Sequence, residues 1–209
     1  MIPISDKIAG YLTDLFGSDA VERYGKYLED DPATYLRSNS IKTNRDEVQE
    51  DLLSNYGITT EKLSEISDAL KVVGDKTFIG KTLEHSIGDY YIQSLSSMIP
   101  PLVLNPQPTD KVLDLCSAPG SKTTQLAALM QNKGTLLVNE IQLDRLKTLV
   151  FNLERMNVVN AGVIHSKGEV LSRFFQNHFD KILVDAPCSG LGIMQKKNEV
   201  SNWWTKEKA

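Results

Sequence analysis

The chain has 209 residues, 41% of them hydrophobic, and a formal net charge of −4. This length suits one large domain or two small ones, and the net acidity argues against a general nucleic-acid binder. The sequence has no apolar run of about 18 residues, and it begins without the basic flank and apolar core of a secretory signal. We therefore expect neither a membrane span nor a signal peptide.

Charge and cysteine usage distinguish the two halves of the chain. Residues 1–104 carry 10 Lys and Arg against 17 Asp and Glu, whereas residues 105–209 carry 13 against 10. The second half is the better candidate for contact with nucleic acid, although ordinary solvated charge explains the difference about as well. Cys116 and Cys188 are the only cysteines. They are too few for a four-ligand zinc site, so we expect no metal, and free thiols in a cytoplasmic protein.

Helices and a strand are predicted at the start of the chain. Helical spacing over residues 4–31 predicts two helices with a break near Gly17. Residues 35–43 alternate like a strand, and Asn44 then caps a helix to about Asn55.

The next segment is expected to hold a hairpin and a helix. Residues 71–78 indicate a hairpin that turns at Gly74-Asp75, and residues 88–104 indicate a helix that ends at Pro100-Pro101. Because two further prolines follow in a linker-like stretch, we place a domain boundary near residue 105.

The second half is organised around residues 111–123, which read KVLDLCSAPGSKT. The pattern predicts a buried strand, a tight turn of small residues over 116–121 and a helix over 122–130. This order builds a ligand crevice in an open α/β sheet, where a helix start faces anionic groups. The dinucleotide fingerprint is absent because only Gly120 is available, and the phosphate-binding loop matches poorly, so a generic tight turn is the plain alternative.

Three further strands are predicted. Residues 135–139, 161–165 and 179–185 are short apolar runs, and a helix is expected over residues 144–156. Glu140 ends the first of these strands. Two carboxylate oxygens at that place suit the vicinal hydroxyls of a ribose.

Two strand ends carry motifs that resemble a known family. Residues 111–123 resemble motif I of the Sun-type (RsmB/RsmF-like) S-adenosylmethionine-dependent RNA cytosine-5 methyltransferases, and DAPCSG at residues 185–190 resembles their complete motif IV. Arg37, Asn39 and Lys42 match an R-x-N-x-x-K-T-like strand of the family. The resemblance covers most of residues 35–204.

The resemblance implies an α/β fold. The expected architecture is a Rossmann-like class I methyltransferase sheet, here incomplete, preceded by a small helical and α+β N-terminal domain. Residues 1–104 would form the RNA-binding type of domain, and residues 105–209 the methyltransferase domain. Cofactor binding is assigned to Cys116, Ser117, Ala118, Pro119, Gly120, Ser121, Lys122, Glu140 and Asp185.

Catalysis is assigned to Asp185 and Cys188, for methyl transfer to C5 of a cytosine in RNA. C5 is a poor nucleophile, so a thiolate must add to C6, an acid near N3 must assist, and a base must later remove the C5 proton. Asp185 is placed to hold the ring. In the family, a cysteine in a later T-C-S motif attacks C6, and the Pro-Cys cysteine, here Cys188, assists breakdown of the adduct.

The sequence departs from the family pattern in two ways. Residues 166–169 read SKGE where an aspartate usually meets the adenine amino group, so the adenine contact is unassigned. No T-C-S motif is present, and four of the usual seven strands are found, so we expect the chain to lack its C-terminal part. The strand at 179–185 would then be an unpaired sheet edge.

The sequence leaves alternatives open for the substrate and for the activity. The likeness of GSKTTQ and DAPCSG to bacterial ribosomal members favours ribosomal RNA over transfer RNA. A second reading is a catalytically incomplete fragment that binds cofactor or RNA. A third is a DNA cytosine-5 methyltransferase that uses Cys188 as its nucleophile.

Overall fold

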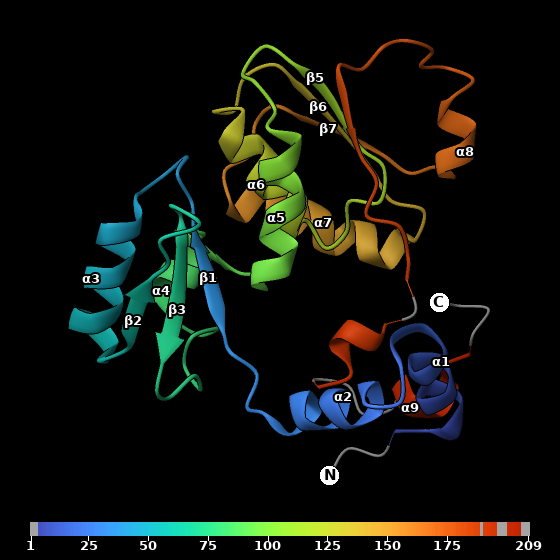
Figure 1. The fold of residues 1–209 in the computed structure, drawn as a ribbon. Coiled ribbons are helices and arrows are strands. Elements are labelled where there is room, and N and C mark those ends of the chain that lie inside the picture. The colour runs from blue at the N-terminus through green and yellow to red at the C-terminus, as the bar shows by residue number, and fades with distance from the viewer. Residues whose placement is uncertain (1–3, 189, 196–199, 206–209) are drawn as a thin grey trace. The chain divides into compact units, whose positions relative to one another are not determined.

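The computed structural model describes residues 4–188, 190–195 and 200–205 (Figure 1). No helix within these described ranges combines the length and the apolarity that a membrane crossing requires.

The chain divides into two compact units. The first joins residues 1–33 to residues 187–209, and the second comprises residues 34–186. The boundary expected near residue 105 falls inside the second unit, between its two sheets.

The first unit is helical. It contains α1 (Asp6–Phe16), α2 (Ala20–Glu29), the 3-10 helix η1 (Leu191–Ile193) and α9 (Val200–Trp203). The predicted break after α1 is confirmed at Gly17, which caps the helix with a φ of 90°. Apolar residues from both segments of the unit form one core: Ile8, Leu12, Ala20, Leu28, Met194, Val200 and Trp204.

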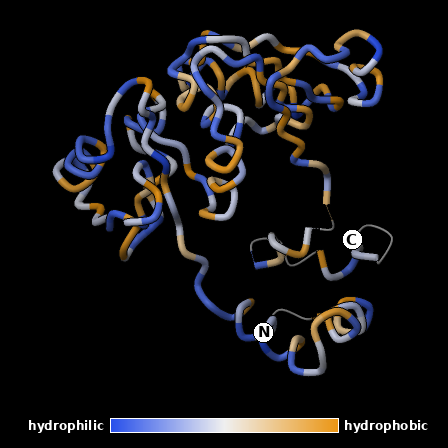
Figure 2. Tube along the Cα trace, turned by 45° about the horizontal axis from the view of Figure 1, so that its top comes forward, coloured by the Kyte–Doolittle hydropathy of each residue, from blue (hydrophilic) through white to orange (hydrophobic). Residues whose placement is uncertain are grey.

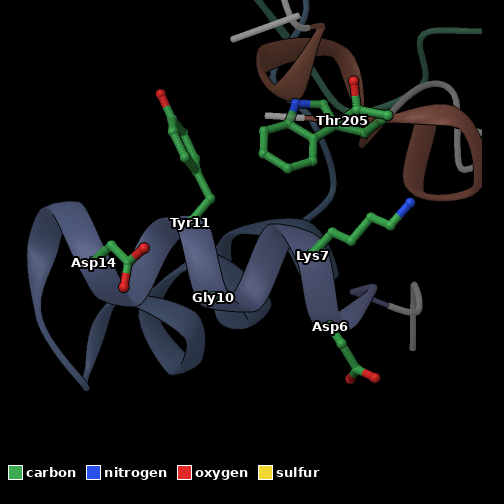
Figure 3. A pocket seen from close by; sticks show the side chains of 7 residues that line it. Asp6, Lys7, Gly10, Tyr11, Asp14 and Thr205 are labelled. Atoms are coloured by element: carbon green, nitrogen blue, oxygen red, sulfur yellow. The ribbon is translucent and has the colours of Figure 1, made fainter. Parts of the chain in front are cut away.

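A pocket of about 380 Å³ lies beside α1 in this unit (Figure 3). The pocket is lined from α1 by Lys7, Tyr11 and Asp14, and Thr205 lies across from this helix. The Tyr11 ring lies 5.1 Å from the ring of Trp204, between centroids. The lining therefore combines charged groups with aromatic rings.

The second unit begins with an antiparallel sheet in the order β2-β3-β1-β4. Its elements are β1 (Tyr35–Ser38), α3 (Arg45–Tyr56), β2 (Thr59–Lys62), β3 (Ala69–Val73), α4 (Leu83–Ile87) and β4 (Tyr90–Ile92). The start of α3 is confirmed, because the Asn44 side chain accepts hydrogen bonds from the backbone N–H groups of Asp46 and Glu47, each at 3.0 Å. Val48 and Leu52 of α3 are buried against the sheet.

The hairpin predicted over residues 71–78 is wrong. β3 pairs with β2 and β1 rather than with a strand after Gly74. The Asp75 carboxylate accepts hydrogen bonds from the backbone N–H and the hydroxyl of Thr77. This side-chain turn competes with strand pairing, so the chain turns away instead of returning along β3.

The single helix predicted over residues 88–104 is also wrong. Tyr90–Ile92 is β4, paired with β1, and α5 (Leu95–Leu104) continues through both prolines. Proline fits helical φ, and the cost of continuing is the loss of two backbone donors. Elsewhere in this helix the Met98 carbonyl accepts a side-chain hydrogen bond from Gln125 Nε2 at 2.9 Å.

A parallel sheet in the order β7-β6-β5-β8 forms the rest of the unit, with its four strands at the predicted places. Its elements are β5 (Lys111–Asp114), α6 (Ser121–Leu129), β6 (Thr135–Asn139), α7 (Leu143–Arg155), β7 (Ala161–Ile164), α8 (Gly168–Leu171) and β8 (Lys181–Leu183). α6 and α7 bury one face of the sheet, with Val112, Leu136, Leu126 and Leu149 fully buried. Figure 2 shows apolar residues gathered within this part of the chain and polar residues on its turns.

β8 is an edge strand among the described residues. It pairs with β5 only, in parallel register, and Ile182 and Val184 are 50% and 55% exposed. The expectation of an exposed apolar edge at this strand is therefore confirmed.

Two glycines with left-handed backbones give a matched test of the packing between the small sheet and α7. A Cβ at Gly88 would lie 2.0 Å from the Arg155 carbonyl oxygen, whereas a Cβ at Gly57 would meet nothing within 4 Å. Gly57→Ala should therefore cost about 1 kcal/mol from backbone strain alone. Gly88→Ala should cost several times as much, measured by urea unfolding. Equal losses of stability would contradict the close contact at Gly88.

Candidate functional site

The loop between β5 and α6 lies at the carboxyl edge of the parallel sheet. Gly120 has a φ of 106°, and a Cβ there would lie 3.2 Å from a methyl group of Leu149. Ala118 is buried and Cys116 is half-buried. Small residues are therefore required for the loop to pass this close to α7, and they leave its backbone accessible to a ligand.

Serine and asparagine side chains tie the loop to the sheet. The Ser117 hydroxyl donates to the Asp114 carbonyl at 2.7 Å and accepts from the Asn139 backbone N–H at 3.1 Å. The Asn139 amide donates to the Leu115 carbonyl at 3.0 Å and accepts from the Ser166 N–H at 3.1 Å. β5, β6 and the segment after β7 thus share one hydrogen-bonded junction.

Asp114 is a buried carboxylate beneath the loop. It is 1% exposed, and its Oδ2 accepts a hydrogen bond from the Thr123 hydroxyl at 2.7 Å. Its Oδ1 is buried and has no hydrogen-bond partner among the residues that the structure describes. Burial raises the pKa of Asp114 to about 6, the Thr123 hydrogen bond opposes this, and the charge of Asp185 raises the pKa further.

Glu140 follows β6 and is 3% exposed. Its Oε1 accepts from the Gln142 N–H at 2.9 Å, and its Oε2 lies 3.5 Å from the Arg145 guanidinium. Arg145 also donates to the Ala118 carbonyl at 2.5 Å. The carboxylate is thus held in one orientation next to the loop.

Asp185 follows β8 and faces the same loop. Its carboxylate lies 2.6 Å from the Lys122 ammonium, and it is the more exposed partner of this ion pair. Burial raises the pKa of the Cys116 thiol, and the charges of Asp114, Glu140 and Asp185 raise it further. Three carboxylates from three adjacent strand ends therefore act on one small-residue loop.

The structure brings together all the residues predicted to bind a cofactor. Residues 116–122, Glu140 and Asp185 lie at one edge of the sheet in the second unit. Cys188 belongs to the first unit, where its thiol is free and exposed. Ser189 of the same motif lies outside the described residues.

Several residues of this site were not identified from the sequence. Asp114, Arg145 and Asn152 all contact the loop or its flanks, and Asn152 donates to the Pro119 carbonyl at 2.9 Å. An acidic residue at the end of the organising strand was a usable signal for Asp114. Arg145 and Asn152 lie on a helix remote in sequence, and only the fold brings them to the loop.

The matches in the small sheet have internal partners. Arg37 and Asn39 are 2% and 1% exposed. Arg37 donates to the Thr124 hydroxyl, Asn39 donates to two backbone carbonyls, and Lys42 pairs with Asp89 at 3.2 Å. Burial lowers the pKa of Arg37 to about 10. Arg37 and Asn39 are therefore packing residues rather than surface contacts.

No group of three or more metal-binding side chains occurs in the part of the chain that the structure describes.

The segment that replaces the family's usual aspartate begins at Ser166, and Lys167 and Glu169 in it are exposed. Gly168 packs on Leu115, because a Cβ there would lie 3.2 Å from its side chain.

Curated relatives are RNA cytosine methyltransferases. The 26S rRNA (cytosine-C(5))-methyltransferase nsun-1 of Caenorhabditis elegans is 39% identical over 94% of this chain and 30% of that protein. The tRNA (cytosine(49)-C(5))-methyltransferase of Pyrococcus abyssi is 34% identical over 90% of this chain and 60% of that protein. The chain thus spans under a third of the first relative and three fifths of the second.

Solved structures agree with the fold. The crystal structure of a methyltransferase homologue protein from Pyrococcus horikoshii superposes with a TM-score of 0.78 at 29% identity, over 92% of this chain and 63% of that one. The predicted Rossmann-like α/β sheet is thereby confirmed. The model of the family 16S rRNA methyltransferase RsmB/F matches residues 101–209. This match covers more than half of the sequence and confirms the family inferred from the two motifs: the chain belongs to the RsmB/F methyltransferase family.

Proposed function

We propose that the protein transfers a methyl group from S-adenosylmethionine to C5 of a cytosine in RNA. The observation that carries this proposal is the convergence of Asp114, Glu140 and Asp185 on the loop after β5. Membership of the RsmB/F family and the activities named for the relatives support the same reaction.

The residues fit this cofactor. The negative field of three carboxylates, two of which pair with Lys122 and Arg145, suits its cationic sulfonium and ammonium groups, and Oδ1 of Asp114 is buried without a hydrogen-bond partner among the described residues. Glu140 keeps lone pairs on Oε2 for ribose hydroxyls, and the N–H groups at the start of α6 suit a carboxylate. When bound, S-adenosylmethionine supplies an electrophilic methyl group.

Asp185 and Cys188 are proposed to act on the cytosine. Asp185 ends β8 and is half-exposed, so its carboxylate can hydrogen-bond the ring while Lys122 fixes its direction. Cys188 is an exposed free thiol three residues later, suited to assist breakdown of the C6 adduct, as the resemblance implies. The target base must be unpaired or flipped, because C5 and C6 are inaccessible in a stacked helix.

Ribosomal RNA is the proposed substrate class. The family description and the nematode relative name ribosomal RNA, whereas the archaeal relative names transfer RNA. We further propose that residues 105–209 carry the methyltransferase part. The expected cytoplasmic location stays a prediction.

The reaction is tested with tritiated S-adenosylmethionine and the protein at its full natural length. Label should enter ribosomal RNA transcripts in preference to transfer RNA, and cytosine C5 should carry it. Transfer to DNA alone, abolished by Cys188→Ser, would favour the DNA methyltransferase reading. Cofactor binding with no transfer to any nucleic acid would favour a binding function without turnover.

Glu140→Gln should weaken binding of S-adenosylhomocysteine about tenfold to a hundredfold, because a hydrogen bond to a charged acceptor is lost. Isothermal titration calorimetry measures this change. Glu154→Gln on α7 is the matched control and should bind normally, since Glu154 is exposed and is not among the residues at the loop. Similar affinities for both variants would remove Glu140 from the cofactor site.

Asp114 should make the stability of the ligand-free protein depend on pH. Its folded-state pKa of about 6 exceeds the usual value for an aspartate. The folded state therefore loses stability as the pH rises from about 4 to about 6, by about 3 kcal/mol, and the loss persists above that range. Asp114→Asn should remove this step.

The measurement is urea unfolding of both proteins at pH 4.5 and pH 7.5. The free energy of unfolding of Asp114→Asn, relative to that of the wild type, should increase from the lower pH to the higher. Asp144→Asn, whose side chain is 94% exposed, should follow the wild type at both. A difference between Asp114→Asn and wild type that stays constant with pH would contradict the assignment.

A further inference from the structure

One face of α7 contacts three consecutive residues of the loop after β5. Arg145, Leu149 and Asn152 are spaced at i, i+4 and i+7, which places them on one helical stripe. Arg145 donates to the Ala118 carbonyl, Asn152 donates to the Pro119 carbonyl, and Leu149 closes against Gly120. The loop therefore takes its position from α7 as much as from the sheet.

Arg155 extends this stripe by three residues toward the small sheet. Its Nε donates to Asn152 Oδ1 at 3.3 Å, and its Nη1 donates to the carbonyls of His85 and Tyr90. Its guanidinium lies 5.3 Å from the centroid of the Tyr91 ring. Because the guanidinium occupies Oδ1 of Asn152, the amide nitrogen of Asn152 is left facing the Pro119 carbonyl.

A second arginine connects the small sheet to the same loop, through a threonine of α6. Arg37 on β1 lies 5.9 Å from the Tyr91 ring centroid and donates to the Thr124 hydroxyl at 2.8 Å. The Thr124 N–H in turn donates to the Gly120 carbonyl at 2.9 Å. Both arginines meet at one tyrosine of β4, so the small sheet reaches the loop by two routes.

We infer that Arg155 is a positioning residue that acts through Asn152 on the Pro119 carbonyl, so that the small antiparallel sheet sets the geometry of the cofactor loop. The contacts run from β4 to Arg155, from Arg155 to Asn152, and from Asn152 to the loop. Only the consequence for cofactor affinity rests on the proposed function.

Cys116 reports on the loop without any cofactor. In a Cys188→Ser background it is the only thiol of the chain, and it is half-buried in the loop. Its rate of alkylation by N-ethylmaleimide should rise about tenfold in Asn152→Ala and in Arg155→Lys, because either change releases a hydrogen bond that holds the loop. Lysine keeps the charge of Arg155 but lacks the planar fork that reaches several acceptors at once.

Two comparisons separate this relay from general loosening. The double variant should label no faster than Asn152→Ala alone, because Arg155 acts through Asn152. Asn39→Ala is the matched control, since this buried asparagine also links the segment before β4 to the end of α7, by donating hydrogen bonds to the carbonyls of Gly88 and Met156 rather than to a loop carbonyl. It should lower the melting temperature and leave the labelling rate within twofold of the parent.

The inference is overturned if Arg155→Lys and Asn152→Ala label within twofold of the parent, if Asn39→Ala labels as fast as they do, or if the double variant is additive. Titration with S-adenosylhomocysteine then measures the consequence for cofactor affinity. The affinity should fall about tenfold in Asn152→Ala and in Arg155→Lys, and it should be unchanged in Asn39→Ala. A parent protein that binds no S-adenosylhomocysteine would overturn the proposed function, while the labelling rates would still decide the relay.

Discussion

The position of β5 between β6 and β8 is the constraint on which the rest of the second unit depends. Hydrogen bonds on both edges fix the strand, and parallel pairing sends the ends of all three strands to the same edge of the sheet. Asp114, Glu140 and Asp185 stand at those ends, so three acids far apart in sequence become neighbours. Each is then oriented by its own partner: a hydroxyl, a backbone amide or a lysine.

Much of this arrangement follows from short-range patterns in the sequence. Apolar runs over a few residues predicted the parallel strands, and in β5 and β6 they reflect burial, because strands buried on both faces carry little polar alternation. Asn44 predicted the start of α3 because its side chain satisfies amides that the helix leaves free. Glu140 and Asp185 were identified because each stands at the end of a predicted apolar strand, whereas Asp114, at the end of β5, was not assigned a role.

What the sequence did not predict depends on contacts across long separations. The strand Thr59–Lys62 has three exposed residues of four and no apolar alternation, and it exists because β3 offers it an edge. Nothing in the sequence predicted that Arg37 is buried, because arginine is usually exposed, yet the Tyr91 ring and a threonine hydroxyl accommodate it inside. Asn152 has no local signal either, because its partner is a loop carbonyl 33 residues earlier.

The make-up of the first unit has a consequence for biosynthesis. Its core combines residues from α1 and α2 with Met194, Val200 and Trp204, and Tyr24 donates its hydroxyl hydrogen bond to the Leu191 carbonyl, 167 positions later. At the usual pace of translation, roughly ten to thirty seconds separate the emergence of the two segments from the ribosome. During that interval α1 and α2 can pack against each other, but the part of their shared core that Met194, Val200 and Trp204 later cover stays exposed to solvent.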